Sequence, residues 1–173
     1  NRFPSSIPLL NRLIAEVYFE EFDWVAPSPR VFNLAMPPRH METEYGLPRQ
    51  AAPEALRRLR RLIDRREFGV NFITEVRFVA PDDSWLSPAY RRESCQLGGY
   101  IGETPRWRDY FRGFGEIALD LGGRPHWGKT FFAETERLRE AYPKFRDFER
   151  LRREYDPDGV FLNDFTRRIF GLP

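Results

Sequence analysis

The sequence holds few of the residues that build metal or disulfide sites. Its 173 residues include one cysteine, Cys95, and two histidines, His40 and His126. A single cysteine can form neither an internal disulfide nor a cysteine-built zinc site, and two histidines are too few for a histidine-rich one. We therefore expect no metal site, and we interpret Cys95 as a small buried residue of a strand.

Long apolar runs and nucleotide-binding loops are also absent. No run of about 18 apolar residues could cross a membrane, and no signal peptide is recognisable. We expect a cytoplasmic protein, and peripheral attachment to a membrane through other regions is left open. The first residue is Asn rather than Met, so we expect a chain excised or trimmed from a longer one. There is neither a GxGxxG nor a Walker motif, so the chain by itself is not expected to bind a nucleotide.

A strong charge of one sign is missing as well. Lysine and arginine number 28 against 26 acidic residues, giving a net charge of +2. The arginines between residues 57 and 66 could bind phosphate, or they could form the solvated face of a helix. Acidic residues interleaved along the chain favour the solvated face, and we expect no nucleic-acid partner.

What the sequence does contain predicts one folded domain of the α+β class. Hydrophobic residues make up 41% and aromatic residues 16% of the chain, enough for a packed core. Few strands alternate strictly with helices, which favours an antiparallel sheet flanked by helices over a doubly wound fold. The expected helices span 5–21, 53–66, 104–121, 133–141 and 143–155, with a short one after Asn163, and the expected strands span 31–36, 41–47, 71–80 and 95–102. The stripe of the first helix expected to face inward is Leu9, Leu10, Leu13, Ile14 and Val17.

Glu75 and Arg77 form the first candidate site. Residues two apart on a strand share a face, so this carboxylate and guanidinium should lie side by side, flanked by Ile73 and Val79. Such a pair suits a redox site, where the carboxylate orients a fixed positive charge. An exposed ion pair on a sheet surface explains the spacing equally well.

His126 and Lys129 form the second candidate site. They follow a loop signal, Gly122-Gly123-Arg124-Pro125, and loops often carry functional residues. His126 could hold or exchange a proton, and Lys129 could place a positive charge beside a substrate or cofactor. A loop whose two polar groups simply face water is the other interpretation. The pair Glu42 and Glu44 is explained by alternation on a half-buried strand.

Together the motifs resemble the carboxy-terminal region of the aldonolactone oxidases, a flavoprotein family that also includes alditol oxidases and belongs to the vanillyl-alcohol oxidase superfamily. The similarity covers roughly residues 39 to 171. The segments that carry it are Arg39-His40-Met41-Glu42-Thr43-Glu44-Tyr45-Gly46-Leu47-Pro48, Glu75-Val76-Arg77, Trp85-Leu86-Ser87-Pro88-Ala89-Tyr90, Arg124-Pro125-His126-Trp127-Gly128-Lys129, Tyr142-Pro143 and Asp156-Pro157-Asp158-Gly159-Val160-Phe161-Leu162-Asn163.

This resemblance implies that residues 1–173 form a single carboxy-terminal cap domain with a helical tail, and that the FAD-binding domain lies outside them. It also implies that Glu75, Arg77, His126 and Lys129 line the cavity between flavin and substrate, with the last three next to the cofactor. Gly98-Gly99-Tyr100 departs from the polar, aromatic-rich stretch expected there, and Tyr100 is a weaker candidate.

The reaction implied by the resemblance is hydride transfer from a hydroxyl-bearing carbon of a sugar lactone or polyol to flavin N5, with electrons then passing to oxygen or another acceptor. The partners implied are that substrate and the chain's own flavin domain, and the uncovered face could also pair two copies. The isolated chain is expected to be inactive. The alternative is a non-catalytic α+β binding or scaffold module.

Overall fold

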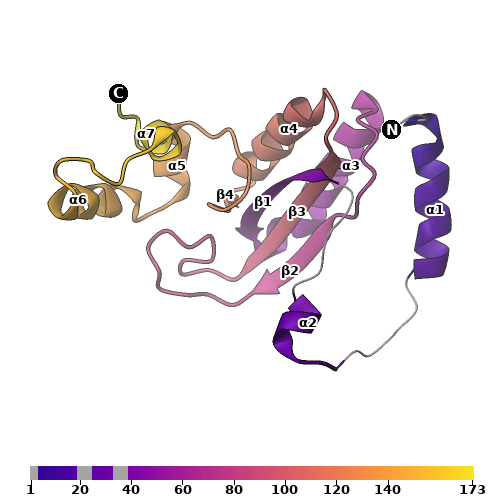
Figure 1. Ribbon diagram of the computed structural model, residues 1–173, viewed down its shortest axis with the longest axis horizontal. Helices are drawn as coiled ribbons and strands as arrows, with labels where there is room; N and C mark the ends of the chain where they lie inside the picture. Colours follow the sequence, from indigo (N-terminus) through magenta and orange to yellow (C-terminus); the bar gives the residue numbers. More distant parts are fainter. Residues whose placement is uncertain (1–3, 19–24, 33–38) are drawn as a thin grey trace.

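The computed structural model describes residues 4–18, 25–32 and 39–173. At its centre lies a four-stranded antiparallel sheet with the strand order β2-β3-β1-β4. Helices lie on one face of this sheet and at one end of it, which confirms the α+β class (Figure 1). The strands are β1 His40–Pro48, β2 Glu75–Val79, β3 Ser94–Gly102 and β4 Arg124–Pro125.

The helices follow the expected order with shifted ends. Pro53 stands in the first turn of its helix, where its missing N–H costs nothing, and Gly122 follows the end of the next with a positive φ. Asn163 caps the last one, as expected. The helices are α1 Ile7–Tyr18, α2 Ser28–Phe32, α3 Ala52–Arg66, α4 Trp107–Asp120, α5 Thr135–Ala141, α6 Phe145–Tyr155 and α7 Asp164–Phe170, with 3-10 turns at Pro4–Ser6 and Arg49–Ala51.

One face of the sheet packs on α3 and α4 and forms the core. Tyr45, Leu47, Leu97 and Ile101 are buried there against the aromatic side of α4. The helix α4 lies so close to β3 that a side chain does not fit at every position of the strand. A Cβ on Gly99 would stand 2.6 Å from the Phe114 ring. Alternate residues of the same strands point to the opposite face, which carries the polar side chains described below.

Three expectations about the elements were wrong. Val31 and Phe32 belong to the short helix α2, with Pro29 in its first turn, while the rest of the strand expected at 31–36 lies outside the described residues. The strand expected at 71–80 is shorter, because the Asn71 side chain, not the backbone, accepts a hydrogen bond from Gly102 N at 3.1 Å.

The apolar stripe of α1 was also expected to face inward, yet it is exposed. This helix stands beside the sheet rather than on it, and it meets the body through buried Ile7 and through Asn11, which donates to Val70 O at 3.3 Å (Figure 1). The exposed side chains are Leu9, Leu10, Leu13, Ile14 and Val17.

Candidate functional site

The sheet face opposite α3 and α4 is polar, and strand register determines which residues share it. Glu75 of β2 pairs with Gly98 of β3, and Gly98 pairs with Glu44 of β1. Arg77 pairs with Gln96 one step along the same face. Directly paired residues project to the same side, so Glu44, Glu75 and Arg77 lie together on this face.

Arg77 bridges two carboxylates that come from different strands. Its Nη2 donates to Glu44 Oε1 at 2.8 Å, and its Nε lies 3.3 Å from Glu75 Oε1. The other oxygen of Glu75 accepts the Tyr100 hydroxyl at 2.7 Å. The two glutamates differ in exposure: the Glu44 side chain is 3% exposed and the Glu75 side chain is 37% exposed. The guanidinium is thus held at two of its nitrogens.

A second ionic group lies further along β1 on the same face. Lys129 bonds Glu42 Oε2, and His40 Nε2 lies 2.9 Å from Glu42 Oε1. Tyr100 connects this group to the first, because it pairs with Glu42 in the sheet and its ring lies 6.0 Å from that of His40. Each of the two cations, Arg77 and Lys129, therefore forms an ion pair with a carboxylate of β1.

The loop that carries Lys129 is fixed by its backbone and by one tryptophan. Thr130 N donates to Glu42 O at 3.0 Å, which extends the pairing with β1 beyond β4. The Trp127 indole donates to Leu86 O at 2.7 Å and stacks on Tyr142 with ring centroids 5.0 Å apart. Beside this loop lies an open hollow of about 550 Å³, lined by His40, Met41, Glu42, Trp127, Gly128, Lys129, Thr130 and Phe165.

His126 lies next to Glu44 through its backbone. Its N–H donates to Glu44 O at 2.9 Å, which continues the register in which Arg124 opposes Gly46 and Pro125 opposes Tyr45. That register places His126 on the polar face. Its Nδ1 accepts from Gly128 N at 3.0 Å, so the neutral ring carries its proton on Nε2.

Two groups on this face have displaced pKa values. Burial raises the pKa of Glu42, but hydrogen bonds and charge from Lys129 and His40 outweigh it and hold that pKa below its ordinary value. The pKa of Tyr100 is raised, first by burial and then by Glu75, which accepts its proton. At neutral pH the face therefore presents ionised Glu42 and a protonated tyrosine.

The structure brings together the four residues singled out in the sequence. Glu75 and Arg77 are in contact, and His126 and Lys129 lie on the same face over β1. Sequence reasoning missed the carboxylates behind the cations, because alternation on a half-buried strand explained Glu42 and Glu44 without a function. One available signal was the burial expected of two acidic residues within a strand that supplies the core, since buried carboxylates require partners.

The described residues 4–18, 25–32 and 39–173 contain no group of three or more His, Cys, Asp or Glu side chains that could hold a metal ion. Cys95 is buried on the core side of β3, as expected. Within the same ranges no helix is both long and apolar enough to cross a membrane.

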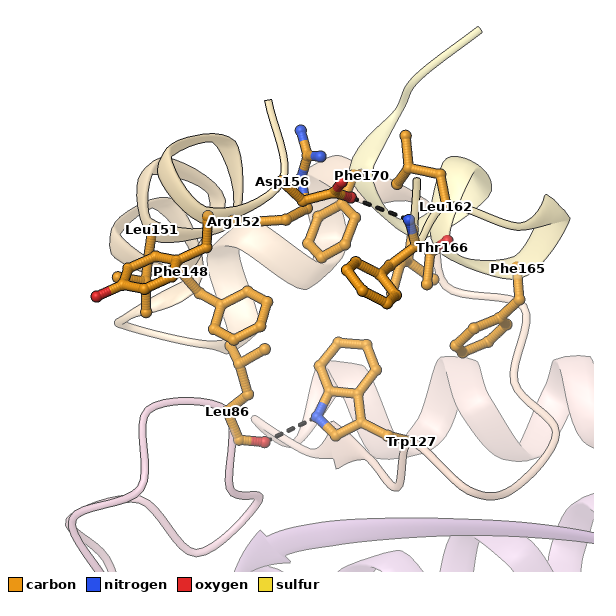
Figure 2. Close-up of a pocket in the computed structure, with 13 residues that line it drawn as sticks. Leu86, Trp127, Phe148, Leu151, Arg152, Asp156, Leu162, Phe165, Thr166 and Phe170 are labelled. Carbon is orange, nitrogen blue, oxygen red and sulfur yellow. Dashed lines mark hydrogen bonds between the residues drawn. The ribbon is translucent and has the colours of Figure 1, made fainter. Parts of the chain in front are cut away.

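An apolar groove of about 630 Å³ adjoins the hollow, and it shares Trp127 and Phe165 with it. Figure 2 shows Trp127 at the bottom of this groove, hydrogen-bonded to Leu86, with aromatic side chains of α6 and α7 above it. Asp156 shapes its rim by accepting from Val160 N at 2.7 Å and from Phe161 N at 3.2 Å. Phe161 itself is largely exposed.

Comparison with known proteins places this arrangement in a family. The family model described as D-arabinono-1,4-lactone oxidase matches residues 1–169. An L-gulono-1,4-lactone dehydrogenase of Mycobacterium tuberculosis is 42% identical over 98% of this chain, which spans 40% of that relative. An L-gulonolactone oxidase of Scyliorhinus torazame is 33% identical over 96% of the chain and 39% of its own length.

An alditol oxidase of Streptomyces is 38% identical over 75% of the chain and 31% of its own length. The chain thus spans about two fifths or less of the length of these relatives. The match extends over nearly all of its residues, including both β1 and the loop of Lys129. This chain belongs to the D-arabinono-1,4-lactone oxidase family, a family of oxidoreductases.

Proposed function

We propose that this chain is the substrate-side domain of an FAD-dependent oxidoreductase that acts on a CH–OH group of an aldono-1,4-lactone or a polyol. The observation that carries the proposal is that two cations, Arg77 and Lys129, lie on one open face of the sheet. Each forms an ion pair with a carboxylate of the same strand, β1. A binding or scaffold module has no need for two cations held on one open face, one of them on a buried carboxylate, whereas a site that stabilises developing negative charge does.

The residues present suit a flavin. The open face offers guanidinium and ammonium donors, and the Nη1 group of Arg77 has no hydrogen-bond partner among the described residues. When bound, FAD would accept a hydride from the substrate carbon and pass the electrons on to oxygen or another acceptor.

The roles of this chain's own residues follow from their contacts. Arg77 and Lys129 would stabilise negative charge on the substrate oxygen and on the cofactor. Glu75 orients Arg77 through Nε and is itself held by Tyr100. His126 would hold a substrate hydroxyl through its Nε2–H, because Nδ1 already accepts from Gly128.

The flavin-binding domain is proposed to lie in the part of the relatives that this chain does not span. Supporting this, the chain covers 40% of the M. tuberculosis relative and has no phosphate-binding glycine loop. Residues 1–173 would then be one cap domain with its helical tail, and the chain alone would not turn over substrate.

The test is turnover of aldono-1,4-lactones and alditols by the full-length protein, with its flavin domain and bound FAD. We expect Arg77→Ala to lower kcat by roughly 100- to 1,000-fold without unfolding the protein, since it removes a charge that acts in the transition state. Arg60→Ala is the matched control, because Arg60 makes an exposed ion pair with Asp64 on α3. Near-normal turnover of Arg77→Ala would remove Arg77 from the site.

A further inference from the structure

Glu44 is a carboxylate in a place that ordinarily excludes one. Its side chain is 3% exposed, and on β1 its neighbours Thr43 and Tyr45 belong to the core face. Among the described residues, Arg77 is the one hydrogen-bond partner of its carboxylate. A buried carboxylate lowers the stability of the fold unless it is paired. Stability alone would therefore favour an apolar or hydroxyl-bearing side chain at this position.

The partner of Glu44 is not buried with it. The Arg77 side chain is 52% exposed, and it crosses from β2 over β3 to reach β1. The crossing passes beside Gly98, which pairs with Glu75 on one side and with Glu44 on the other. A Cβ at Gly98 would stand 3.2 Å from the Tyr100 ring, tighter than ordinary contact, so glycine at this position leaves room for the tyrosine that holds Glu75.

The two carboxylates hold different atoms of the guanidinium. Nε lies 3.3 Å from a Glu75 oxygen and Nη2 donates to Glu44, so contacts at two different nitrogens restrict both the position and the rotation of the group. The N–H groups of Nη1 remain available to a ligand. With Glu75 alone, Arg77 would retain one anchor near its stem and could pivot about it.

We propose that Glu44 is a positioning residue that fixes the orientation of Arg77 from beneath the site, across the gap at Gly98, without touching substrate or cofactor. This inference rests on the proposed function, because it assigns Glu44 an effect through Arg77. A displacement of about 1 Å in a group that stabilises the transition state can cost about 100-fold in rate.

The experiment is a double-mutant cycle of Glu44→Gln and Arg77→Ala in the full-length protein, with its flavin domain and bound FAD. Glutamine keeps the shape and one acceptor oxygen and removes the charge. We expect Glu44→Gln to lower kcat by about 10- to 100-fold with little change in KM. In the Arg77→Ala background it should cause no further loss, because a positioning residue has nothing left to position.

Thermal unfolding of the same four proteins gives a readout that does not depend on activity. Arg77→Ala leaves the buried Glu44 carboxylate without its partner, so we expect this variant to unfold at the lowest temperature. The double variant, in which the stranded charge is also removed, should unfold at a higher temperature than Arg77→Ala. Glu93→Gln is the control, since Glu93 makes an exposed pair with Arg49 at 3.4 Å.

Losses in kcat that add in the double variant, or normal turnover of Glu44→Gln, would overturn the inference and leave the proposed function standing. Normal turnover of Arg77→Ala would overturn the proposed function and the inference with it. If Glu44→Gln fails to fold, Glu44→Asp serves instead. The shorter side chain keeps the charge but withdraws the carboxylate from Arg77, and we expect reduced kcat that disappears in the Arg77→Ala background. An additive loss would again reject the role of Glu44.

Discussion

The two faces of the central sheet use alternate residues of the same strands for opposite purposes. On β1, Tyr45 and Leu47 are buried against α4, whereas Glu42 and Glu44 hold cations on the other side. On β3, neighbouring glycines follow the same division, because Gly99 lies under Phe114 and Gly98 lies between two glutamates. Packing on the core face depends on the shape and volume of the side chains. The arrangement of the polar face depends on which charged groups form ion pairs.

The comparison predicts its largest effect on the core face. Phe114 is fully buried and contacts the rings of Tyr45 and Tyr110. We expect Phe114→Ala to lower the free energy of unfolding by about 3–5 kcal/mol, because it removes apolar burial and leaves a cavity. Denaturant unfolding measures this change. A loss below about 1 kcal/mol would show that α4 does not hold the core as described.

The adjacent glycines provide a matched pair for the difference between the faces. A Cβ at Gly99 would meet the Phe114 ring at 2.6 Å, whereas a Cβ at Gly98 would meet the edge of the Tyr100 ring at 3.2 Å. We expect Gly99→Ala to lower the free energy of unfolding by about 1–3 kcal/mol through overpacking.

By contrast, Gly98→Ala should change unfolding by less than about 1 kcal/mol, since replacing glycine also restricts the unfolded chain. Both variants are measured by the same denaturant titration. Equal losses of stability would mean that the two faces do not differ in packing in the way we describe.

The smallest effect concerns pH on the polar face. Because the pKa of Glu42 is held below the ordinary glutamate value of 4.5, its ion pairs stabilise the folded state above that pH. This stability is lost as pH falls through the lowered pKa. We expect wild type to be more stable than Glu42→Gln at about pH 6, and the difference to shrink towards about pH 3.

Unfolding temperatures of the two proteins across this range measure the effect. Glu93→Gln, which alters an exposed pair with Arg49, should differ little from wild type throughout. A difference between wild type and Glu42→Gln that grows as pH falls would contradict the lowered pKa of Glu42 and the part that Lys129 plays in it.

Much of the fold followed from local pattern. Helical periodicity located α3 and α4 closely, and Pro53 and Asn163 marked helix starts. Local sequence pattern gave wrong predictions where contacts between distant parts of the chain determine the structure. The stripe of α1 has helical spacing, but the described part of the chain offers it no face to pack against, and the Asn71 side chain takes the place of strand pairing beside Gly102.

For the candidate site too, some features follow from local pattern and others from contacts between distant residues. Alternation along a strand placed Glu75 and Arg77 on one face from the sequence alone, and the loop signal at Gly122-Gly123 pointed to Lys129. The pairing of Arg77 with Glu44 joins residues 33 positions apart, and that of Lys129 with Glu42 joins residues 87 positions apart. Such pairs depend on the register between strands, which local spacing does not determine. The sequence therefore determined which side chains share a face of a single strand, and only the tertiary structure decided which carboxylate each cation meets, because that choice depends on how distant strands align.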